Sequence, residues 1–257
     1  MSPGLSWLTR PGLAGGIDKT GERAGELLGL GFGSVEFGSV TVAPLVGSNP
    51  GLRALLERIA IPQGYFLRGA VHREKQPKTA IGIGLGLPPD LPPARLAAEW
   101  LAGLHLLAEA PPVADYLSLN LSAAANRRFV GGDLRPILLD ALAAVADFRR
   151  GQGDCQRSFL ALKLPVDAVP VLWPALLAAG LDQLTVVLPD GPGRLESLAQ
   201  VATLAASGEG PVLVAVGGIR SATDRLAVLA AGASGVQVHR LFVMHGDVTP
   251  DLLLAAA

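Results

Sequence analysis

Residues 211–240, PVLVAVGGIRSATDRLAVLAAGASGVQVHR, decide the fold. Residues 212–216 are apolar without alternation, which is typical of a parallel strand buried on both faces. Two glycines follow, and Ser221 is suited to cap a helix that ends near the next glycine. A second strand is predicted at 234–238. The stretch therefore has the strand, helix, strand order of an α/β protein.

The glycine pair in this stretch indicates an anion site. Gly217 and Gly218 follow a strand directly, and glycines there let backbone N–H groups approach an anion closely. Arg240, just past the second strand, adds a positive charge. In an eight-stranded parallel barrel the loops after the last two strands form the usual phosphate site. The alternative is that the glycines only make a tight turn, but the two neighbouring strand ends favour the phosphate interpretation.

Working outward, the chain alternates predicted strands and helices with short connections and no internal linker. About eight such units in 257 residues predict a single (β/α)8 barrel domain that spans 1–257. Residues 44–78 are the irregular part, with one helical piece expected near 52–59. The strands are expected at 12–17, 34–41, 79–85, 115–121, 159–164, 183–188, 212–216 and 234–238. The helices are expected at 20–30, 93–108, 134–149, 169–179, 194–206, 221–231 and 250–257.

Composition excludes several classes of function. Half of the residues are apolar, 17% are charged and the net charge is −1, so a nucleic-acid partner is not expected. The single cysteine, Cys155, excludes an internal disulfide, and no histidine spacing suggests a metal site. No membrane-spanning run or signal peptide is recognisable, so a cytoplasmic location without membrane association is expected. The sequence leaves a homo-oligomer open.

Polar side chains end two of the predicted strands. Asn120 finishes an otherwise apolar strand, and such an amide must find hydrogen-bond partners from a neighbour or a ligand. Lys163 ends another buried strand, where a charge is costly unless it meets an anion. We therefore favour a ligand contact over a structural role for Lys163.

Six motifs together resemble the dihydroorotate dehydrogenases, FMN-dependent (β/α)8 flavoproteins of pyrimidine synthesis. The resemblance covers about residues 11–246 and is nearest to the single-chain, quinone-linked class. The first two motifs are specific, whereas VGGI with AGAS is shared by many phosphate-binding barrels. The motifs are GLAGGIDKTGE, GFGSVEFGSVT, YLSLNLS, LALKLP, VAVGGI and AGASGVQVHR.

The resemblance implies a set of FMN-binding residues. Lys19 and Asn120 are implied to contact the substrate as well as the flavin, and Ser39 keeps the hydroxyl of a family threonine. His239 and Arg240 replace a usual tyrosine-serine pair whose backbone meets the phosphate. Pro192 to Arg194 resembles a shortened phosphate-side loop. The implied cofactor-binding residues are Ala14, Gly15, Lys19, Ser39, Asn120, Lys163, Gly217, Gly218, His239 and Arg240.

The departures from the family pattern fall where the substrate should bind. The catalytic base, serine or cysteine in the family, corresponds to Ala123, whose methyl group cannot accept a proton. No catalytic residue is therefore assigned. Family amides are replaced by Pro62, by glycines in the third strand and by Val187-Leu188 in the sixth. A pocket without these amides leaves the polar groups of orotate unsatisfied.

Two hypotheses follow. The first is a flavoprotein oxidoreductase that binds FMN but has altered or lost dihydroorotate activity, acting on a less polar substrate. The second is a non-catalytic barrel, a pseudoenzyme that acts as a partner or scaffold. The strand-end groups Lys19, Asn120 and Lys163 favour the first, because a scaffold does not need them. The sequence identifies neither the small-molecule substrate nor the electron acceptor, and without the family's N-terminal extension direct use of quinone is not expected.

Overall fold

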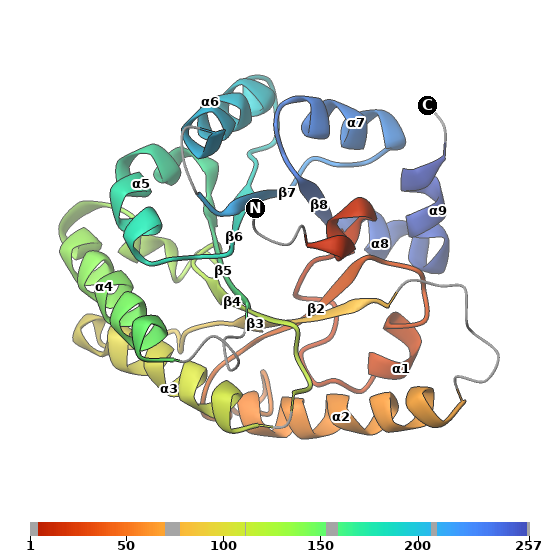
Figure 1. Cartoon of the computed structure of the whole chain (residues 1–257), viewed down its shortest axis with the longest axis horizontal. Helices are drawn as coiled ribbons and strands as arrows, with labels where there is room; N and C mark the ends of the chain where they lie inside the picture. The colour runs from red at the N-terminus through yellow and green to blue at the C-terminus, as the bar shows by residue number, and fades with distance from the viewer. Residues whose placement is uncertain (1–4, 70–77, 111, 153–158, 207–209, 256–257) are drawn as a thin grey trace.

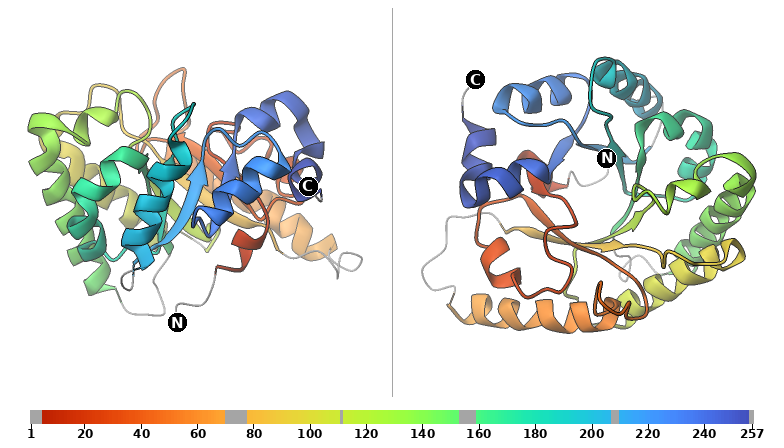
Figure 2. Two further views of the ribbon diagram at one scale, coloured as in Figure 1. Left: turned by 90° about the horizontal axis from the view of Figure 1, so that it is seen from above. Right: turned by 180° about the vertical axis from the view of Figure 1, so that it is seen from behind.

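The chain folds into a closed barrel of eight parallel strands surrounded by helices (Figures 1 and 2). The computed structural model describes residues 5–69, 78–110, 112–152, 159–206 and 210–255, with the backbone alone for 61–69. Strands pair in sequence order and β8 closes on β1, so the predicted (β/α)8 fold is confirmed. The strands are β1 (Gly12–Leu13), β2 (Ser34–Val40), β3 (Ala80–Leu85), β4 (Tyr116–Asn120), β5 (Phe159–Pro165), β6 (Gln183–Val187), β7 (Val212–Val216) and β8 (Gly235–Val238).

The α-helices form the outer layer of the barrel. They are α1 (Ala24–Leu27), α2 (Leu52–Gly69), α3 (Leu96–Glu109), α4 (Arg135–Gly151), α5 (Val169–Ala178), α6 (Arg194–Ala206), α7 (Ala222–Ala230), α8 (Arg240–His245) and α9 (Thr249–Leu254). Short 3₁₀ turns include η1 (Ser6–Thr9), η4 (Arg127–Phe129) and η7 (Val166–Ala168). Among the described helices, none is both long and apolar enough to cross a membrane.

Burial explains why the apolar runs form strands and the periodic runs form helices. Every residue of β3, β4 and β8 is buried, as expected for strands covered by helices outside and by packed side chains inside. On α3 an apolar stripe at helical spacing is buried against the barrel: Leu96, Trp100, Leu104 and Leu107. Ser221 caps α7 as predicted, because its Oγ accepts a hydrogen bond from the Asp224 N–H at 3.1 Å.

The structure corrects several predicted elements. The strand predicted at 12–17 is only β1, Gly12–Leu13. The 20–30 helix shrinks to α1, because the Asp18 carboxylate accepts hydrogen bonds from the N–H groups of Thr20, Gly21 and Arg23 and holds them in a loop. The helix predicted near 52–59 continues as α2 to Gly69, through Pro62. Before Pro62 the helix buries Leu52, Leu55, Leu56 and Ile59. The short helix α8 was not predicted.

The end of the barrel where the strands begin is closed by η1 (Figure 2). Trp7 stacks on Tyr116 at the start of β4, with ring centroids 6.1 Å apart, and meets the edge of Phe159 at the start of β5 at 5.5 Å. Aromatic contacts of this kind add packing energy beyond area burial. These contacts fix η1 against the N-terminal ends of β4 and β5.

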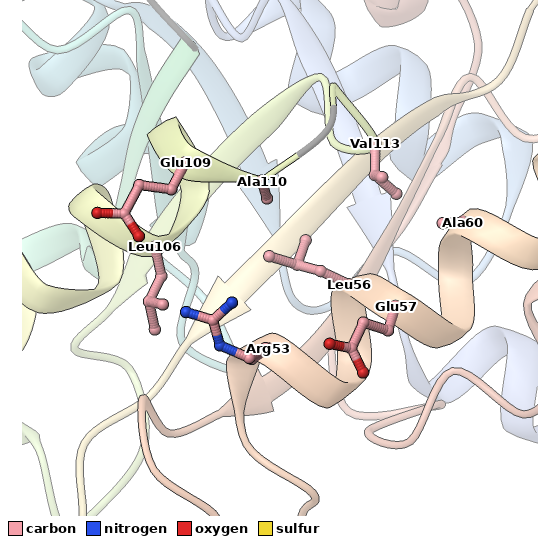
Figure 3. A pocket seen from close by; sticks show the side chains of 8 residues that line it. All are labelled: Arg53, Leu56, Glu57, Ala60, Leu106, Glu109, Ala110 and Val113. Atoms are coloured by element: carbon pink, nitrogen blue, oxygen red, sulfur yellow. The ribbon is translucent and has the colours of Figure 1, made fainter.

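A cavity of ≈ 300 Å³ lies in the helix layer between α2 and α3 (Figure 3). Its lining joins Leu56 and Ala60 of α2 to Leu106 of α3 and to Val113, which precedes β4. Arg53, Glu57 and Glu109 stand at its edge. In barrels of this type the chemistry is at the C-terminal ends of the strands, so this cavity is not the candidate site.

Candidate functional site

A buried ion pair lies inside the barrel below the C-terminal strand ends. Lys163 Nζ of β5 lies 3.7 Å from Glu36 Oε1 of β2, and the two side chains are 7% and 0% exposed. Glu36 Oε1 has no hydrogen-bond partner. Glu36 thus supplies an anion beside Lys163 and gives this lysine a structural partner, while its contact with a ligand stays a prediction.

Two further polar groups extend this pair across the barrel. Gln237 Nε2 of β8 lies 3.2 Å from the Tyr116 hydroxyl and 3.4 Å from Glu36 Oε2. Burial, followed by the nearby Glu36 charge, raises the pKa of Tyr116 well above its usual value. The phenol therefore stays protonated and serves as a hydrogen-bonding group rather than a base.

Asn120 organises the mouth of the barrel. Its Nδ2 donates to Ser39 Oγ at 2.6 Å, and its Oδ1 accepts from the N–H and the hydroxyl of Ser122 at 2.9 and 2.7 Å. Strand register sets Asn120 opposite Lys163 on the neighbouring strand. Ser39, Asn120 and Lys163, which come from three separate motifs, are therefore brought together at one place.

Ala123, to which the resemblance assigns the catalytic base of the family, is open to solvent. Ala123 is exposed with its two alanine neighbours, and its carbonyl accepts hydrogen bonds from the N–H groups of Asn126 and Arg127. The Asn126 amide donates to the Asn120 carbonyl at 2.9 Å, so Asn126 serves the turn instead of replacing a lost substrate contact. The Ser122 hydroxyl is committed to Asn120. None of these described side chains at the end of β4 is an evident proton acceptor.

The glycine turn after β7 borders a small cavity of ≈ 100 Å³. Gly217 and Gly218 have φ of 108° and 66°, a region that favours glycine. A Cβ on Gly217 would meet the Leu188 carbonyl at 2.6 Å, and one on Gly218 would meet Arg194 Nη1 at 2.2 Å. The glycines therefore serve the turn as well as the cavity. The lining residues are Val216, Gly217, Gly218, Ile219, Arg220, Gln237, Val238, His239 and Arg240.

Charged side chains surround this cavity. Arg240 donates to Asp190 at 2.8 Å, and Arg220 lies 3.7 Å from the same carboxylate. The hydrogen bond from Arg240 holds the pKa of Asp190 below its usual value. Arg194 donates to the Gly218 carbonyl at 2.7 Å and to Asp224 at 2.6 Å. The predicted charge of Arg240 is thus present, but a carboxylate that sequence reasoning missed already contacts it.

His239 lines this cavity, and its ring also lies near Gly16 of the first motif. Its imidazole is half-buried, and a Cβ on Gly16 would lie 3.1 Å from His239 Nε2. Burial, with the Lys163 and Arg240 charges, lowers the pKa of His239. The ring is therefore neutral at neutral pH.

The first motif is placed around the same mouth. Ala14 is buried and donates its N–H to the Val238 carbonyl at 2.9 Å, and a Cβ on Gly15 would meet Glu36 Oε1 at 2.7 Å. Lys19 is exposed and has no hydrogen bond or ion pair with the residues that the structure describes. The Pro62 side chain and Cys155 lie outside the described residues. Within the described ranges no group of three histidine, cysteine or acidic residues could hold a metal ion.

Sequence reasoning missed Glu36 and Asp190 and left the role of Arg194 undecided. Glu36 carries a usable signal, because a carboxylate amid the apolar SVEFGSV strand requires a buried partner. Asp190 follows β6 in a polar loop, where its pairing with Arg240 leaves no local pattern.

The chain was compared with known proteins. No protein-family model matches it. It is 31% identical over 289 residues to a quinone-linked dihydroorotate dehydrogenase of Thermus thermophilus, covering 98% of this chain and 80% of that protein. The corresponding enzyme of Acidithiobacillus ferrooxidans is 30% identical over 287 residues, covering 95% and 76%. The fold matches a ferulenol complex of the Eimeria tenella enzyme with a TM-score of 0.75 at 18% identity, covering 95% and 79%. Because the chain is about 30% identical to these relatives over nearly its whole length and folds into the same kind of barrel, it belongs to the dihydroorotate dehydrogenase family.

Proposed function

We propose that the chain is an FMN-binding oxidoreductase in which the dihydroorotate activity of the family is altered or lost. The observation that carries this proposal is the composition of the barrel mouth. Asn120 and Lys163 stand side by side on β4 and β5, while Ala123, three residues beyond Asn120, is exposed and has no group that accepts a proton. The groups suited to hold a flavin are kept, and the group that the family reaction requires is absent.

The residues present fit both the phosphate and the ring system of FMN. The ≈ 100 Å³ cavity beside Gly217 and Gly218 combines backbone at a glycine turn with two arginines, which suits a phosphate. Inside the barrel, Glu36 Oε1 is an unpartnered buried oxygen beside the Lys163 ammonium, so this region has polar capacity left for a further group. Asn120 and Ser39 add an amide and a hydroxyl at the same mouth.

Bound FMN supplies a two-electron acceptor or donor. The chain's own contribution is then positional and electrostatic. Glu36 fixes the Lys163 ammonium inside the barrel, and Ser39 fixes the Asn120 amide. A substrate that must lose a proton as it is oxidised finds no acceptor at Ala123, so this arrangement supports chemistry with a different proton route from that of dihydroorotate.

One observation favours the alternative, a non-catalytic barrel that acts as a partner or scaffold. Several polar groups at the mouth already have an internal partner: Asn120 with Ser39 and Ser122, Lys163 with Glu36, and Arg240 with Asp190. Such a mouth is stable without a ligand. The unpartnered oxygen of Glu36 and the glycine-lined cavity weigh against this alternative.

Anaerobic mixing separates these functions. The protein loaded with FMN is mixed with excess dihydroorotate, and flavin absorbance is followed. We expect FMN to bind and its absorbance to persist, because the proton acceptor and the substrate amides are missing. Rapid bleaching by dihydroorotate contradicts the altered activity, and failure to bind FMN favours the scaffold.

A further inference from the structure

A third cavity, of ≈ 490 Å³, lies at the C-terminal ends of β5 and β6, next to the connection from β4 to α4. Pro165 ends β5 and Val187 ends β6, and they are opposite each other in the strand register. Pro165 comes two residues after Lys163, and Val187 comes two residues after Thr185. Lys163 and Thr185 are also opposite each other in the register, and both are buried. Side chains two residues apart on a strand point to the same face. Pro165 and Val187 therefore form a layer one step nearer the C-terminal strand ends than the layer that contains Lys163.

One part of the lining of this cavity is apolar. It includes the position where the family pattern has a threonine-asparagine pair and this chain has Val187-Leu188. Val187 and Leu188 offer a polar ring no side-chain hydrogen bond at this position, whereas they can pack against an apolar body. The apolar lining residues are Val130, Pro165, Val166, Ala168, Val171, Val187, Leu188 and Pro189.

Two arginines give the cavity its charge. Arg127 is anchored by its Nε, which donates to the Ser122 carbonyl at 3.0 Å, and Ser122 is in turn bound to Asn120. Arg135 begins α4, and its Nε is buried without a hydrogen-bond partner. No ion pair among the described residues involves either guanidinium. The one acidic residue of the lining is Asp167, so the cavity is net positive.

We propose that this cavity is the substrate site and that it takes an apolar molecule bearing one carboxylate, which Arg135 and Arg127 bind. Guanidinium groups pair with carboxylates through charge-assisted, often bidentate hydrogen bonds, and both Arg127 and Arg135 line the cavity without an ion pair among the described residues. The inference rests on the proposed function, because it names the substrate class of the same barrel mouth. The volume of the cavity, ≈ 490 Å³, is in the range of sites for small organic ligands.

Calorimetric titration tests the site on the full chain, after FMN content has been measured from the visible spectrum. The probes are phenylacetate and hexanoate, with phenylacetamide and hexanamide as neutral matches, and orotate. We expect the carboxylates to bind and the amides to bind at least about tenfold more weakly, because a charge-assisted hydrogen bond is lost. Binding of amides as tightly as carboxylates, or tighter binding of orotate, overturns the assignment.

Variants connect the binding to this cavity. Arg135→Gln should weaken phenylacetate about tenfold and leave phenylacetamide unchanged. Arg53→Gln in the α2–α3 cavity of Figure 3 is the matched control and should change neither. Val171→Asp alters an exposed lining residue, so folding is preserved while the added negative charge should repel the carboxylate.

The outcomes separate the two proposals. If FMN is bound but phenylacetate binding is absent or insensitive to both Arg135→Gln and Val171→Asp, the substrate class is wrong and the proposed function stands. If phenylacetate binds in an Arg135-dependent way without any FMN binding, the anion-binding cavity is supported and the flavoprotein proposal fails.

Discussion

Lys163 Nζ and Glu36 Oε1 lie 3.7 Å apart inside the barrel, and both side chains are almost fully buried. β5 and β2 are not adjacent strands, so the pair joins opposite parts of the barrel wall. It also sets a lysine next to an oxygen that has no hydrogen-bond partner, directly below the mouth.

Glu36→Gln should destabilise the protein by about 3–5 kcal/mol, because Lys163 is left as a buried charge without its partner. The double variant Glu36→Gln with Lys163→Met should recover much of this loss, since no unpaired charge remains. Urea unfolding of the flavin-free chain measures both. A loss of less than about 1 kcal/mol in the single variant contradicts the pairing.

Asp190 and FMN phosphate are expected to compete for Arg240 and Arg220. Asp190→Asn should raise FMN affinity about twofold to fivefold, and Arg240→Ala should lower it by about tenfold or less, because both partners are exposed. Fluorescence titration measures the change. Riboflavin, which lacks the phosphate, is the control, and equal effects on riboflavin exclude competition at the phosphate cavity.

Ala123→Ser should restore little dihydroorotate oxidation. The serine supplies a hydroxyl at the base position, but Val187 and Leu188 still provide no amide for the substrate ring. Flavin bleaching by dihydroorotate under anaerobic conditions should differ from the unaltered chain by less than about tenfold. A gain well beyond that value would show that the base alone limits the reaction.

Stability should depend on pH through His239. Because burial lowers the pKa of His239 below its usual 6.5, the unfolded chain binds this proton more tightly. The stability contributed by the neutral imidazole is present above pH 6.5 and is lost as the pH falls below it toward the folded pKa. Thermal unfolding from about pH 8 to about pH 5 should show the wild type losing Tm relative to His239→Gln. If the Tm difference between the wild type and His239→Gln stays constant across this pH range, the lowered pKa of His239 is contradicted.

The sequence was sufficient for the fold because apolar strands and glycine turns are local signals. It also indicated the glycine turn, Ser39, Asn120 and Lys163, since polar groups at strand ends are unusual where strands are buried. It did not reveal which groups pair across the barrel. Glu36 meets Lys163 and Asp190 meets Arg240 only after the barrel closes. The predicted length of the 20–30 helix was wrong because hydrogen bonds to the Asp18 carboxylate hold its first residues in a loop, and the predicted end of the 52–59 helix was wrong because α2 continues through Pro62.

The visible spectrum of the purified full-length chain tests the central claim, that this barrel is a flavin-binding member of its family. The protein should be yellow, and heat should release FMN rather than FAD, because the cavity beside Gly217 and Gly218 has room for about one phosphate. A colourless protein that also fails to bind added FMN in titration would contradict the account.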